Sequence, residues 1–444
     1  MKRYRSRVFP FLLLLLAGVA LTFAACGDDD DDDDGTPTDA PTDAPTDAPD
    51  IGSVDVLGIW GDDELLNFEA LVQPWEDSTG GDLSFLGTRD ITAQLTTRVE
   101  GNNPPDVAIP AEIGLFQDFA AEGLLAPLSD CPGLEAKITA NYPAGFVDLG
   151  TVDGTLYGFF MKADTKGTIF YDPAYFAANN LTPLTADSSF ADLIALSDEI
   201  AALGLPPWSM GQFANGGTGF PGTDFIQQIL LNEAGGAAIY DGLIDGSVPF
   251  TDAAVKDAWE KFGEIALTPG YTSQGSAEVI NATAFQDGMF PPFEDPPEAA
   301  MAYMGGFGSG IIADQFPNAV AGTDYDFFPF PGGAVTGGAN IVYAFNSDAT
   351  TCSFLDHIAS AEAQQIWVNL GGFTSVNSNV DLNAYPDVVA RAQAEQLTLA
   401  ETFRFDLDDA IGGDLQATFF TGITCYLADP DSLDSILADI EAVR

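Results

Sequence analysis

Histidine and basic residues are scarce in this sequence. The 444 residues include one histidine, His357, and 14 Lys and Arg against 67 Asp and Glu. A single histidine excludes a His-based zinc site, and no cysteine pair has metal-ligand spacing. His357 lies in a predicted helix beside Asp356, which favours a solvated or capping role over that of a general base. Because phosphate binding needs a basic face, nucleic acid is excluded as a partner.

Catalytic and cofactor motifs are also missing. No serine stands in a nucleophile elbow, and the glycine-rich run at 305–310 lacks the lysine and the framing of a phosphate loop. Acids are too abundant for any two of them to be assigned as a glycosidase pair, because that mechanism depends on their separation in space. The sequence therefore predicts no enzyme, no cofactor and no metal.

The N-terminus has the pattern of an export signal. An apolar run over residues 8–25 ends at Ala24, Ala25 and Cys26, which is typical of a lipoprotein signal with Cys26 as the lipidated first residue. A plain signal peptide or a membrane anchor is the alternative, since the run is near the short limit for spanning. The basic residues before it are Lys2, Arg3, Arg5 and Arg7.

The next segment, 26–50, has no means of forming a core. Residues 28–34 are seven consecutive aspartates, and residues 38–49 read TDAP three times. Like charges repel and proline interrupts helices and sheets, so we expect an extended tether. Calcium binding is the alternative for the aspartates, although a flexible stretch offers no fixed coordination geometry. The working protein then begins near Ile51.

The mature chain is strongly acidic. Once the four basic residues of the signal are removed, ten Lys and Arg stand against the 67 acids. This balance argues against docking on anionic lipid through charge, so the acyl chain would have to anchor the protein. An acidic surface suits a saline habitat, where salt screens self-repulsion, or serves solubility alone.

Three cysteines follow Cys26, so an exported chain would leave one of them unpaired. Cys352 and Cys425 lie in the C-terminal quarter beside predicted helices, and they are the favoured disulfide pair. A buried and inert cysteine at any of the three positions is the alternative.

Apolar periodicity predicts an α/β fold. Strands at 54–60, 82–86 and 106–109 alternate with helices starting at Asp62 or Asp63 and at 93–100, which indicates a parallel sheet covered on both faces. The roughly 394 residues after the tether suit two lobes. Ligands in such sheets bind beyond the carboxyl ends of strands. Further strands are expected at 156–160, 167–171 and 341–345, and helices at 190–203, 224–233, 253–267 and 361–370.

Four stretches together resemble the extracellular solute-binding proteins of ABC importers, in the family of maltose- and other oligosaccharide-binding proteins. GIWGDDELLNFEALVQPWEDSTG is similar to the first strand and helix, and AQLTTRVEGNNPPDVAI to the second helix and third strand. GTVDGTLYGFFMKADTKGTIFYDPAYF resembles the crossover between lobes, although Phe160 and Asp172 replace the usual Pro and Asn. TGGANIVYAFNSDATTCSFLDHIASAEAQQIWVNLGGFTSVN is similar to the closing strand and the S-x-E-A-Q helix. The resemblance runs from Val54 to Val443.

This resemblance implies a two-lobed, type II periplasmic-binding-protein-like fold that closes on a ligand between lobes joined by crossover strands. The implied order is a signal at 1–25, a tether at 26–50, lobe 1 at 51–162 and 303–347, and lobe 2 at 163–302 and 348–444. The protein is then a monomer at the cell surface or in the periplasm, held to a membrane by its lipid. Its partners are a carbohydrate and the transmembrane subunits of a permease.

A sugar site needs flat rings for C–H faces and carboxylate, amide or Arg groups for hydroxyls. Residues of these types follow the predicted strands or occupy positions that the resemblance marks. Trp75 and Trp259, at helical spacing among apolar neighbours, are assigned to the core instead. The predicted ligand-binding set is Trp60, Asp62, Asp63, Arg89, Asp90, Glu112, Lys162, Trp208, Phe220, Asp224, Phe307, Asn340, Phe373, Phe419 and Phe420.

Alternatives remain for several members of this set. Phe419 and Phe420 lie on a predicted helix, where aromatic residues are equally often core. Arg89 is either a bidentate hydroxyl clamp or half of a structural ion pair. The favoured function is a surface-anchored carbohydrate-binding lipoprotein of an ABC importer. The alternatives are a receptor for an amino acid or polyamine, an exported glycoside hydrolase, and an adhesin.

Overall fold

The computed structural model describes residues 51–88 and 90–444. The expected signal peptide, Cys26, the tether and Arg89 lie outside the described residues, as do the side chains of Asp62 and Asp63. Among the described helices, none is both long and apolar enough to cross a membrane.

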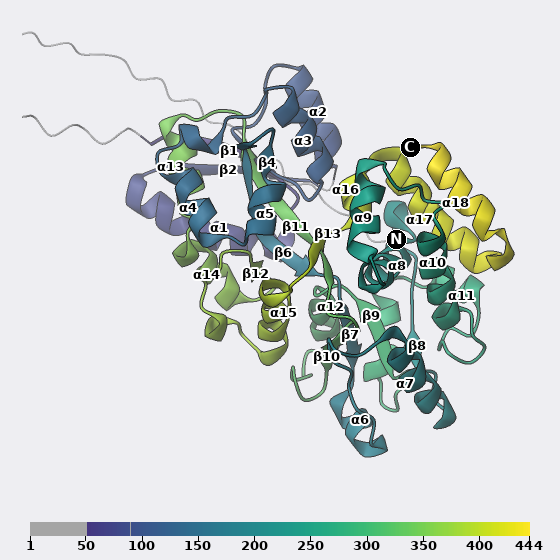
Figure 1. Ribbon diagram of the computed structural model, residues 1–444. Helices are drawn as coiled ribbons and strands as arrows, with labels where there is room; N and C mark the ends of the chain where they lie inside the picture. Colours follow the sequence, from purple (N-terminus) through teal and green to yellow (C-terminus); the bar gives the residue numbers. More distant parts are fainter. Residues whose placement is uncertain (1–50, 89) are drawn as a thin grey trace, which may run out of the picture. The chain divides into compact units, whose positions relative to one another are not determined.

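A seven-stranded sheet organises the first part of the fold (Figure 1). Its strand order is β12-β6-β11-β3-β1-β2, with β13 also paired to β11. β1 runs parallel to β2 and β3, as the alternation of strands and helices predicts, while β11 runs antiparallel to β3 and β6. The strands are β1 (Ser53–Gly58), β2 (Asp82–Gly87), β3 (Val107–Ile109), β6 (Gly158–Thr165), β11 (Val335–Ala344), β12 (Thr374–Ser375) and β13 (Phe403–Phe405).

Amphipathic helices cover this sheet. Leu71, Val72 and Trp75 of α1 face the core, and α1 ends at Gly80, whose φ of 74° is readily adopted by glycine. These helices are α1 (Asp62–Thr79), α2 (Ile91–Glu100), α3 (Ile113–Ala121), η1 (Leu128–Asp130), α4 (Leu134–Asn141), α5 (Ala144–Leu149), α13 (Ala349–Ile358), α14 (Ala361–Leu370), η5 (Leu382–Ala384) and α15 (Val388–Leu399); a small ribbon of β4 (Thr151–Val152) and β5 (Thr155–Leu156) lies between α5 and β6.

A second sheet, of order β10-β7-β9-β8, organises the other part of the fold. Helix α8 runs through its core, and every residue from Pro221 to Leu231 is buried against α9, α10 and α17. The elements are β7 (Thr168–Tyr171), α6 (Pro173–Asn179), α7 (Phe190–Ala202), β8 (Trp208–Ser209), η2 (Asn215–Gly217), α8 (Phe220–Asn232), α9 (Gly236–Asp245), α10 (Ala253–Ala266), α11 (Ala277–Ala282), η3 (Asp287–Met289), η4 (Pro291–Phe293), β9 (Met301–Met304), α12 (Gly308–Gln315), β10 (Asp326–Pro329), α16 (Leu407–Ile411), α17 (Gly413–Ala428), η6 (Pro430–Ser432) and α18 (Leu433–Ala442).

The buried apolar residues divide between the two sheets. One core cluster draws on residues 54–163 and 339–405, while a second large cluster draws on 169–330 and 407–440. The chain therefore passes between the two cores three times. We call these passages the first connection (β6 to β7), the second connection (β10 to β11) and the third connection (β13 to α16).

This division differs from the expected lobe boundaries. Residues 303–330 were expected in lobe 1, but β10 pairs with β7 in the second sheet. Residues 349–405 were expected in lobe 2, but they pack on the first sheet. The indole N–H of Trp75 on α1 donates to the Ser353 hydroxyl on α13 at 3.0 Å, and Phe354 packs against Trp75. The apolar faces of α13 and α14 thus complete the first core.

The disulfide also differs from the expected Cys352–Cys425 pair. Cys352, on α13, is bonded to Cys131, and their Cα atoms are 5.1 Å apart. Cys425 is free and exposed on α17, a helix of the second core. The pairing follows from the fold, because α13 packs beside α4 in the first core and so reaches Cys131.

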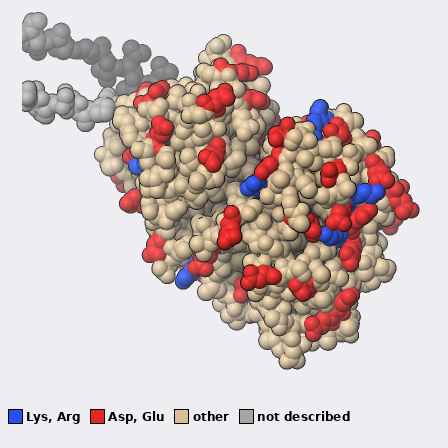
Figure 2. Space-filling view, in the orientation of Figure 1, with Lys and Arg blue, Asp and Glu red and all other residues tan. Residues whose placement is uncertain are grey.

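Acidic side chains are spread over the visible face of the molecule, with few basic ones among them (Figure 2). The exposed Arg391, for example, forms an ion pair with Glu395 at 2.8 Å. The surface therefore matches the charge imbalance of the sequence.

Candidate functional site

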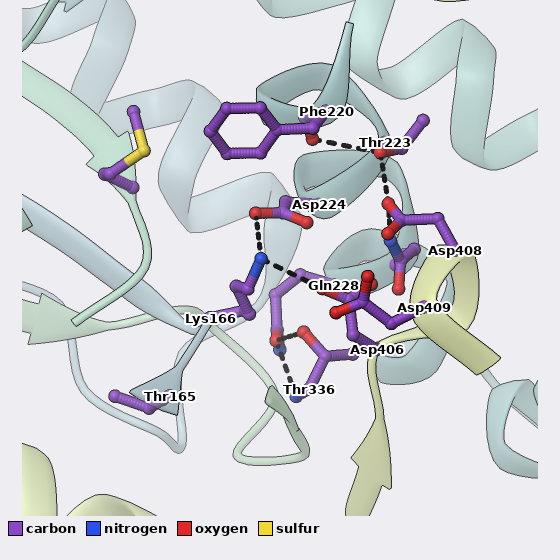
Figure 3. A network of polar contacts seen from close by, with 12 residues as sticks. Thr165, Lys166, Phe220, Thr223, Asp224, Gln228, Thr336, Asp406, Asp408 and Asp409 are labelled. Carbon is purple, nitrogen blue, oxygen red and sulfur yellow. Dashed lines mark hydrogen bonds and ion pairs between the residues drawn. The ribbon is translucent and has the colours of Figure 1, made fainter. Parts of the chain in front are cut away.

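Lys166 lies at the centre of a buried polar cluster (Figure 3). It follows β6 in the first connection, and its Nζ is 2.8 Å from Asp224 Oδ2 and 2.9 Å from Asp406 Oδ2. Asp224 belongs to α8, while Asp406 lies in the third connection. One ammonium group thus joins two of the connections to a core helix.

Asp408 and Asp409 extend the cluster. Asp408 Oδ2 accepts hydrogen bonds from the Thr223 hydroxyl at 2.5 Å and from Gln227 Nε2 at 2.9 Å. Gln227 also accepts a bond of 2.6 Å from the Leu407 amide, which fixes the start of α16. We define the Lys166 cluster as Lys166, Asp224, Asp406, Asp408 and Asp409.

The second connection is attached to the same helix. Gln228 Oε1 accepts bonds from the Thr336 amide at 2.9 Å and from the Thr336 hydroxyl at 2.8 Å, and its Nε2 donates to the Ala334 carbonyl at 2.5 Å. Asn232 donates to the Ala334 carbonyl as well, at 2.9 Å. All three connections therefore converge on α8.

Burial and mutual charge decide the protonation of the cluster. Burial raises the pKa of Asp224 to about 7, although Lys166 opposes the shift. Burial and the neighbouring Asp406 raise the pKa values of Asp408 and Asp409 well above the usual range. Burial would also raise the pKa of Asp406, but Lys166 outweighs it and the value is lowered. Asp406 is therefore the carboxylate that keeps its charge.

Lys166 stays protonated in this environment. Burial would lower its pKa, but Asp224 and Asp406 raise it well above the usual range. Asp224, Asp406 and Asp408 each present an oxygen, all within 4.8 Å of one another, which is the spacing a metal ion needs. The Lys166 ammonium already supplies a positive charge to two of these three carboxylates.

Three phenylalanine rings adjoin the Lys166 cluster. Lys166 Nζ is 5.6 Å from the centroid of Phe220 and 5.9 Å from that of Phe307, within the range of cation–π attraction. Phe285 packs edge-on to Phe220 at 5.1 Å and to Phe307 at 6.5 Å. Each of the three side chains is partly exposed. We call Phe220, Phe285 and Phe307 the aromatic patch.

Phe420 lies next to this patch. Gly219, which precedes Phe220, has a φ of 109°, and a Cβ atom there would stand 2.1 Å from the Phe420 carbonyl oxygen. Only glycine allows this approach of α17 to the start of α8. The structure therefore brings Phe220, Asp224 and Phe307 together around Lys166, with the backbone of Phe420 beside the start of α8.

A second group of predicted residues meets in the first core. Trp60 Nε1 donates to Asn340 Oδ1 at 3.2 Å, and Trp367 stands between Trp60 at 4.9 Å and Phe373 at 4.7 Å. Lys162 Nζ is 5.9 Å from the Trp367 ring and 2.6 Å from Glu64 Oε1. The rings of this group are deeply buried; Trp60 is 1% exposed.

Other predicted residues lie away from both groups. Trp208 is 0% exposed in the second core, where its indole N–H donates to Ser197 at 3.0 Å, so no ring surface is open to a ligand. Phe419 is buried against Trp259, which fits its alternative as a core residue. Asp90 is exposed at the start of α2. Trp75 and Trp259 are core residues, as predicted.

Glu112 belongs to neither group, but its charge acts on the Lys166 cluster. It precedes α3, and its Oε2 atom is buried without a hydrogen-bond partner in the described part of the chain. The Tyr343 hydroxyl is likewise buried and unpartnered there, and burial together with Glu112 raises the pKa of Tyr343. Glu112 also raises the pKa of Asp409, so it contributes to the charge around the Lys166 cluster.

Sequence reasoning missed Lys166, Phe285, Asp406, Asp408 and Asp409. Lys166 carried a usable signal, because it is one of ten basic residues after the signal and directly precedes a predicted strand. The three aspartates stand in a short acidic stretch, FDLDD, that runs from the end of β13 into the first turn of α16. In a chain with 67 acids that stretch has no distinguishing mark.

Two pockets lie elsewhere on the surface. One of about 560 Å³ is lined by Phe190, Lys261 and other residues of α7, α8 and α10. Another of about 590 Å³ is lined by Phe293, Phe316 and several acids. None of the predicted ligand-binding residues lines either pocket.

Known proteins resemble this chain along most of its length. A family model described as bacterial extracellular solute-binding protein matches residues 70–395. The chain is 32% identical over 403 residues to the alpha-glucosides-binding periplasmic protein AglE of Rhizobium meliloti, which covers 86% of this chain and 85% of AglE. It is 31% identical over 385 residues to the osmoprotective compounds-binding protein GgtB of Synechocystis sp., covering 85% and 89%.

Solved structures match the fold. The bacterial solute receptor AcbH superposes with a TM-score of 0.72 at 19% identity, covering 88% of this chain and 97% of AcbH. RafE in complex with raffinose superposes with a TM-score of 0.68 at 17% identity, covering 88% and 98%. The predicted two-lobed α/β fold is confirmed.

Proposed function

This chain belongs to the family of bacterial extracellular solute-binding proteins, and from that premise we propose that it captures a glycoside or oligosaccharide on the aromatic patch and delivers it to an ABC permease. The chain is a carbohydrate-binding receptor of an ABC importer, as predicted from its sequence. The family is one of receptors rather than enzymes. The relative AglE is named for alpha-glucosides, which favours a ligand with an α-glucosidic bond, and GgtB is named for osmoprotective compounds.

The observation that carries this proposal is the pairing of partly exposed rings with buried carboxylates. Phe220 and Phe307 both adjoin Lys166, which binds Asp224. Aromatic rings stack on the apolar C–H faces of sugars, and carboxylates accept hydrogen bonds from hydroxyls. The aromatic patch thus supplies the stacking surface, and the Lys166 cluster beside it supplies the carboxylates.

The connections supply the means of closure. Three short segments join the two cores, and α8 holds all of them through Asp224, Gln227 and Gln228. A ligand on Phe220 acts on the first residue of α8. Binding there favours one conformation of the connections over another, and a ligand drives hinge closure in this way.

The proposed location rests on the N-terminal sequence. Export, lipidation of Cys26 and an acidic tether would hold the receptor at a membrane surface, in the periplasm or outside the cell. The family is extracellular, which supports the export step. Tethering would keep a monomeric receptor near its permease without any charge-based contact with lipid.

The Lys166 cluster weakens the two main alternatives. A glycoside hydrolase needs two carboxyl groups on either side of the scissile bond, whereas Asp224 and Asp406 both bind the same buried ammonium. A polyamine receptor needs carboxylates open to an ammonium ligand, and here Lys166 takes that place. The carbohydrate receptor is the function that fits this geometry.

Ligand-dependent thermal unfolding tests the proposal. Sucrose, trehalose, maltose and raffinose are compared with putrescine and glutamate on the purified full chain. A ligand at 100 times its dissociation constant adds about 2.7 kcal/mol of stability, so a binding sugar raises the Tm measurably. A Tm that rises with putrescine or glutamate and with none of the sugars would reject the carbohydrate ligand.

A further inference from the structure

We propose that the Lys166 cluster selects ligands by charge, admitting uncharged sugars and rejecting sugars that carry a carboxylate. This inference rests on the proposed function and names the class of sugar that the same site accepts. It concerns a group of residues that lies behind the aromatic patch rather than the rings themselves.

The first argument is the imbalance of charge. The cluster has one ammonium and four carboxyl groups; Asp224, Asp406 and Asp408 are at most 3% exposed, and the Lys166 side chain is 12% exposed. Apart from Lys166, the charged groups that perturb these carboxyls are acids, Glu112 included. Once Asp224 and Asp406 are both ionised, a ligand carboxylate brought to this place would meet two negative groups and one ammonium in a medium of low dielectric constant.

The second argument is that the single cation is already engaged. Lys166 binds Asp224 at 2.8 Å and Asp406 at 2.9 Å, and it faces the rings of Phe220 and Phe307. An anionic ligand would have to displace one of these carboxylates to pair with Lys166, leaving it buried and uncompensated. A neutral hydroxyl would displace neither carboxylate, because it could donate to the carboxylate oxygens that Lys166 does not bind.

The third argument concerns those remaining oxygens. Asp224 Oδ1 and Asp406 Oδ1 are buried without a hydrogen-bond partner in the described part of the chain. Because both atoms are buried, they can pair only with a group that enters the cluster; a hydroxyl or a water molecule has a proton to donate to them, whereas an ionised carboxylate has none. The unpaired acceptors of the cluster thus fit a hydroxyl, which donates a hydrogen bond, and do not fit an ionised carboxylate, which only accepts.

The charge on the cluster depends on pH. Near pH 5, Lys166 is balanced by Asp406 alone, because Asp224, Asp408 and Asp409 all have raised pKa values. Near pH 8, Asp224 is ionised and the cluster becomes negative. Tyr240 and Tyr303 also face these groups, but burial raises their pKa values well above the usual range, so they stay neutral. The rejection of anions therefore strengthens as pH rises.

Calorimetric titration of the full chain tests this selection. The neutral probe is whichever of sucrose, trehalose and maltose binds most tightly, and the anionic probe is the same sugar with one C6 oxidised to a carboxylate. We expect the carboxylate form to bind at least tenfold more weakly at pH 8, and the ratio to shrink at least threefold at pH 5. The sugar carboxylate is ionised at both pH values, so the change reports on the protein.

Asp224→Asn is the variant that isolates the effect, and it should reduce the discrimination at pH 8. Asp326→Asn is the matched control, because Asp326 is a half-buried acid of β10 whose pKa is also raised by burial, and it should leave the ratio unchanged. If Asp224→Asn fails to fold, the pH series on the unaltered chain tests the selection without it.

The outcomes separate the two proposals. Binding of the neutral sugar with equal binding of its carboxylate form at pH 8 overturns the charge selection alone. If the ratio of the two dissociation constants changes neither with pH nor in Asp224→Asn, the charge selection is overturned as well. Failure of every neutral sugar to bind, with tight binding of the carboxylate form, overturns the charge selection together with the proposed function.

Discussion

Lys166 and Asp406 form an ion pair of 2.9 Å that joins the first connection between the two cores to the third. Asp224 completes it from α8 at 2.8 Å. The Lys166 side chain therefore joins the first connection to the third, although all four strands of the second sheet lie between Lys166 and Asp406 in the sequence. The stability of the region that connects the two cores and the proposed ligand contacts of the aromatic patch therefore depend on the same residue.

Replacing Lys166 by methionine should destabilise the fold strongly. The substitution leaves Asp224 and Asp406 buried without their cation, and breaking such a pair typically costs about 3–5 kcal/mol. Urea unfolding measures the change. Lys162→Met is the control, because its partner Glu64 is about one-third exposed and loses less when the ion pair is removed. Equal losses in the two variants would contradict the central role of Lys166.

Asp224 should make stability fall as pH rises from about 4 to about 7. Its ordinary pKa is 3.8 and burial raises it to about 7, so the folded state holds a proton in this window that the unfolded chain has released. Above pH 7 its contribution levels off. Thermal unfolding should therefore show a Tm decline across the window that is smaller in Asp224→Asn. Parallel curves for the two proteins would show that Asp224 is not the titrating group.

Removing the Cys131–Cys352 disulfide should lower the free energy of unfolding by about 2–5 kcal/mol. The double variant Cys131→Ser/Cys352→Ser tests this without reductant. Cys425→Ser should be neutral, because Cys425 is free and exposed. Mass spectrometry of unreduced peptides should recover the 131–352 link, and a 352–425 link would refute the pairing.

Truncation of aromatic residues should separate ligand affinity from stability. Phe220→Ala and Phe307→Ala, in the aromatic patch, should weaken sugar binding by about 2 kcal/mol. Trp60→Ala and Trp208→Ala remove side chains buried to 1% and 0% exposure, so they should cost about 3–5 kcal/mol of stability, like Trp75→Ala. Calorimetry with the best sugar and parallel unfolding distinguish the classes. Unchanged affinity in both phenylalanine variants would move the site elsewhere.

Cys26→Ala should release the protein from the membrane fraction or leave it unprocessed. The prediction follows from the basic residues, the apolar run and the Ala-Ala-Cys sequence at the N-terminus. Immunoblots of membrane and soluble fractions from the producing cells give the answer. A variant that is matured and retained like the unaltered protein would rule out lipid anchoring through Cys26.

Local periodicity was a sound guide to the elements. The expected strands at 82–86 and 167–171 correspond to β2 and β7, and the expected helix at 361–370 is α14 with the same bounds. These patterns repeat within one element, so neighbouring residues carry the information. Family and function were also predicted, because several motifs keep their order over the whole chain.

Long-range relationships were harder to predict. The apolar stripe of α13 shows that Phe354 is buried but not in which core, so 349–405 was placed with the wrong sheet and Cys352 with the wrong partner. Trp60 and Trp208 stand at strand ends, where exposure depends on what packs over them. The role of Lys166 depends on its ion pairs with Asp224 and Asp406, and no local sequence pattern connects these residues to it.

The placement of β11 in the first sheet bears on the order of events during secretion. β11 lies between β6 and β3, and it is made of residues 335–344, late in the chain. A chain that leaves the cell from its N-terminus therefore delivers β1, β2 and β3 long before the strand that connects them to β6. Until about three-quarters of the polypeptide has emerged, the first core has an unfilled centre. We expect the early segments to remain unfolded at the outer face of the translocon, exposed to proteases and holding chaperones, and to fold only when β11 arrives.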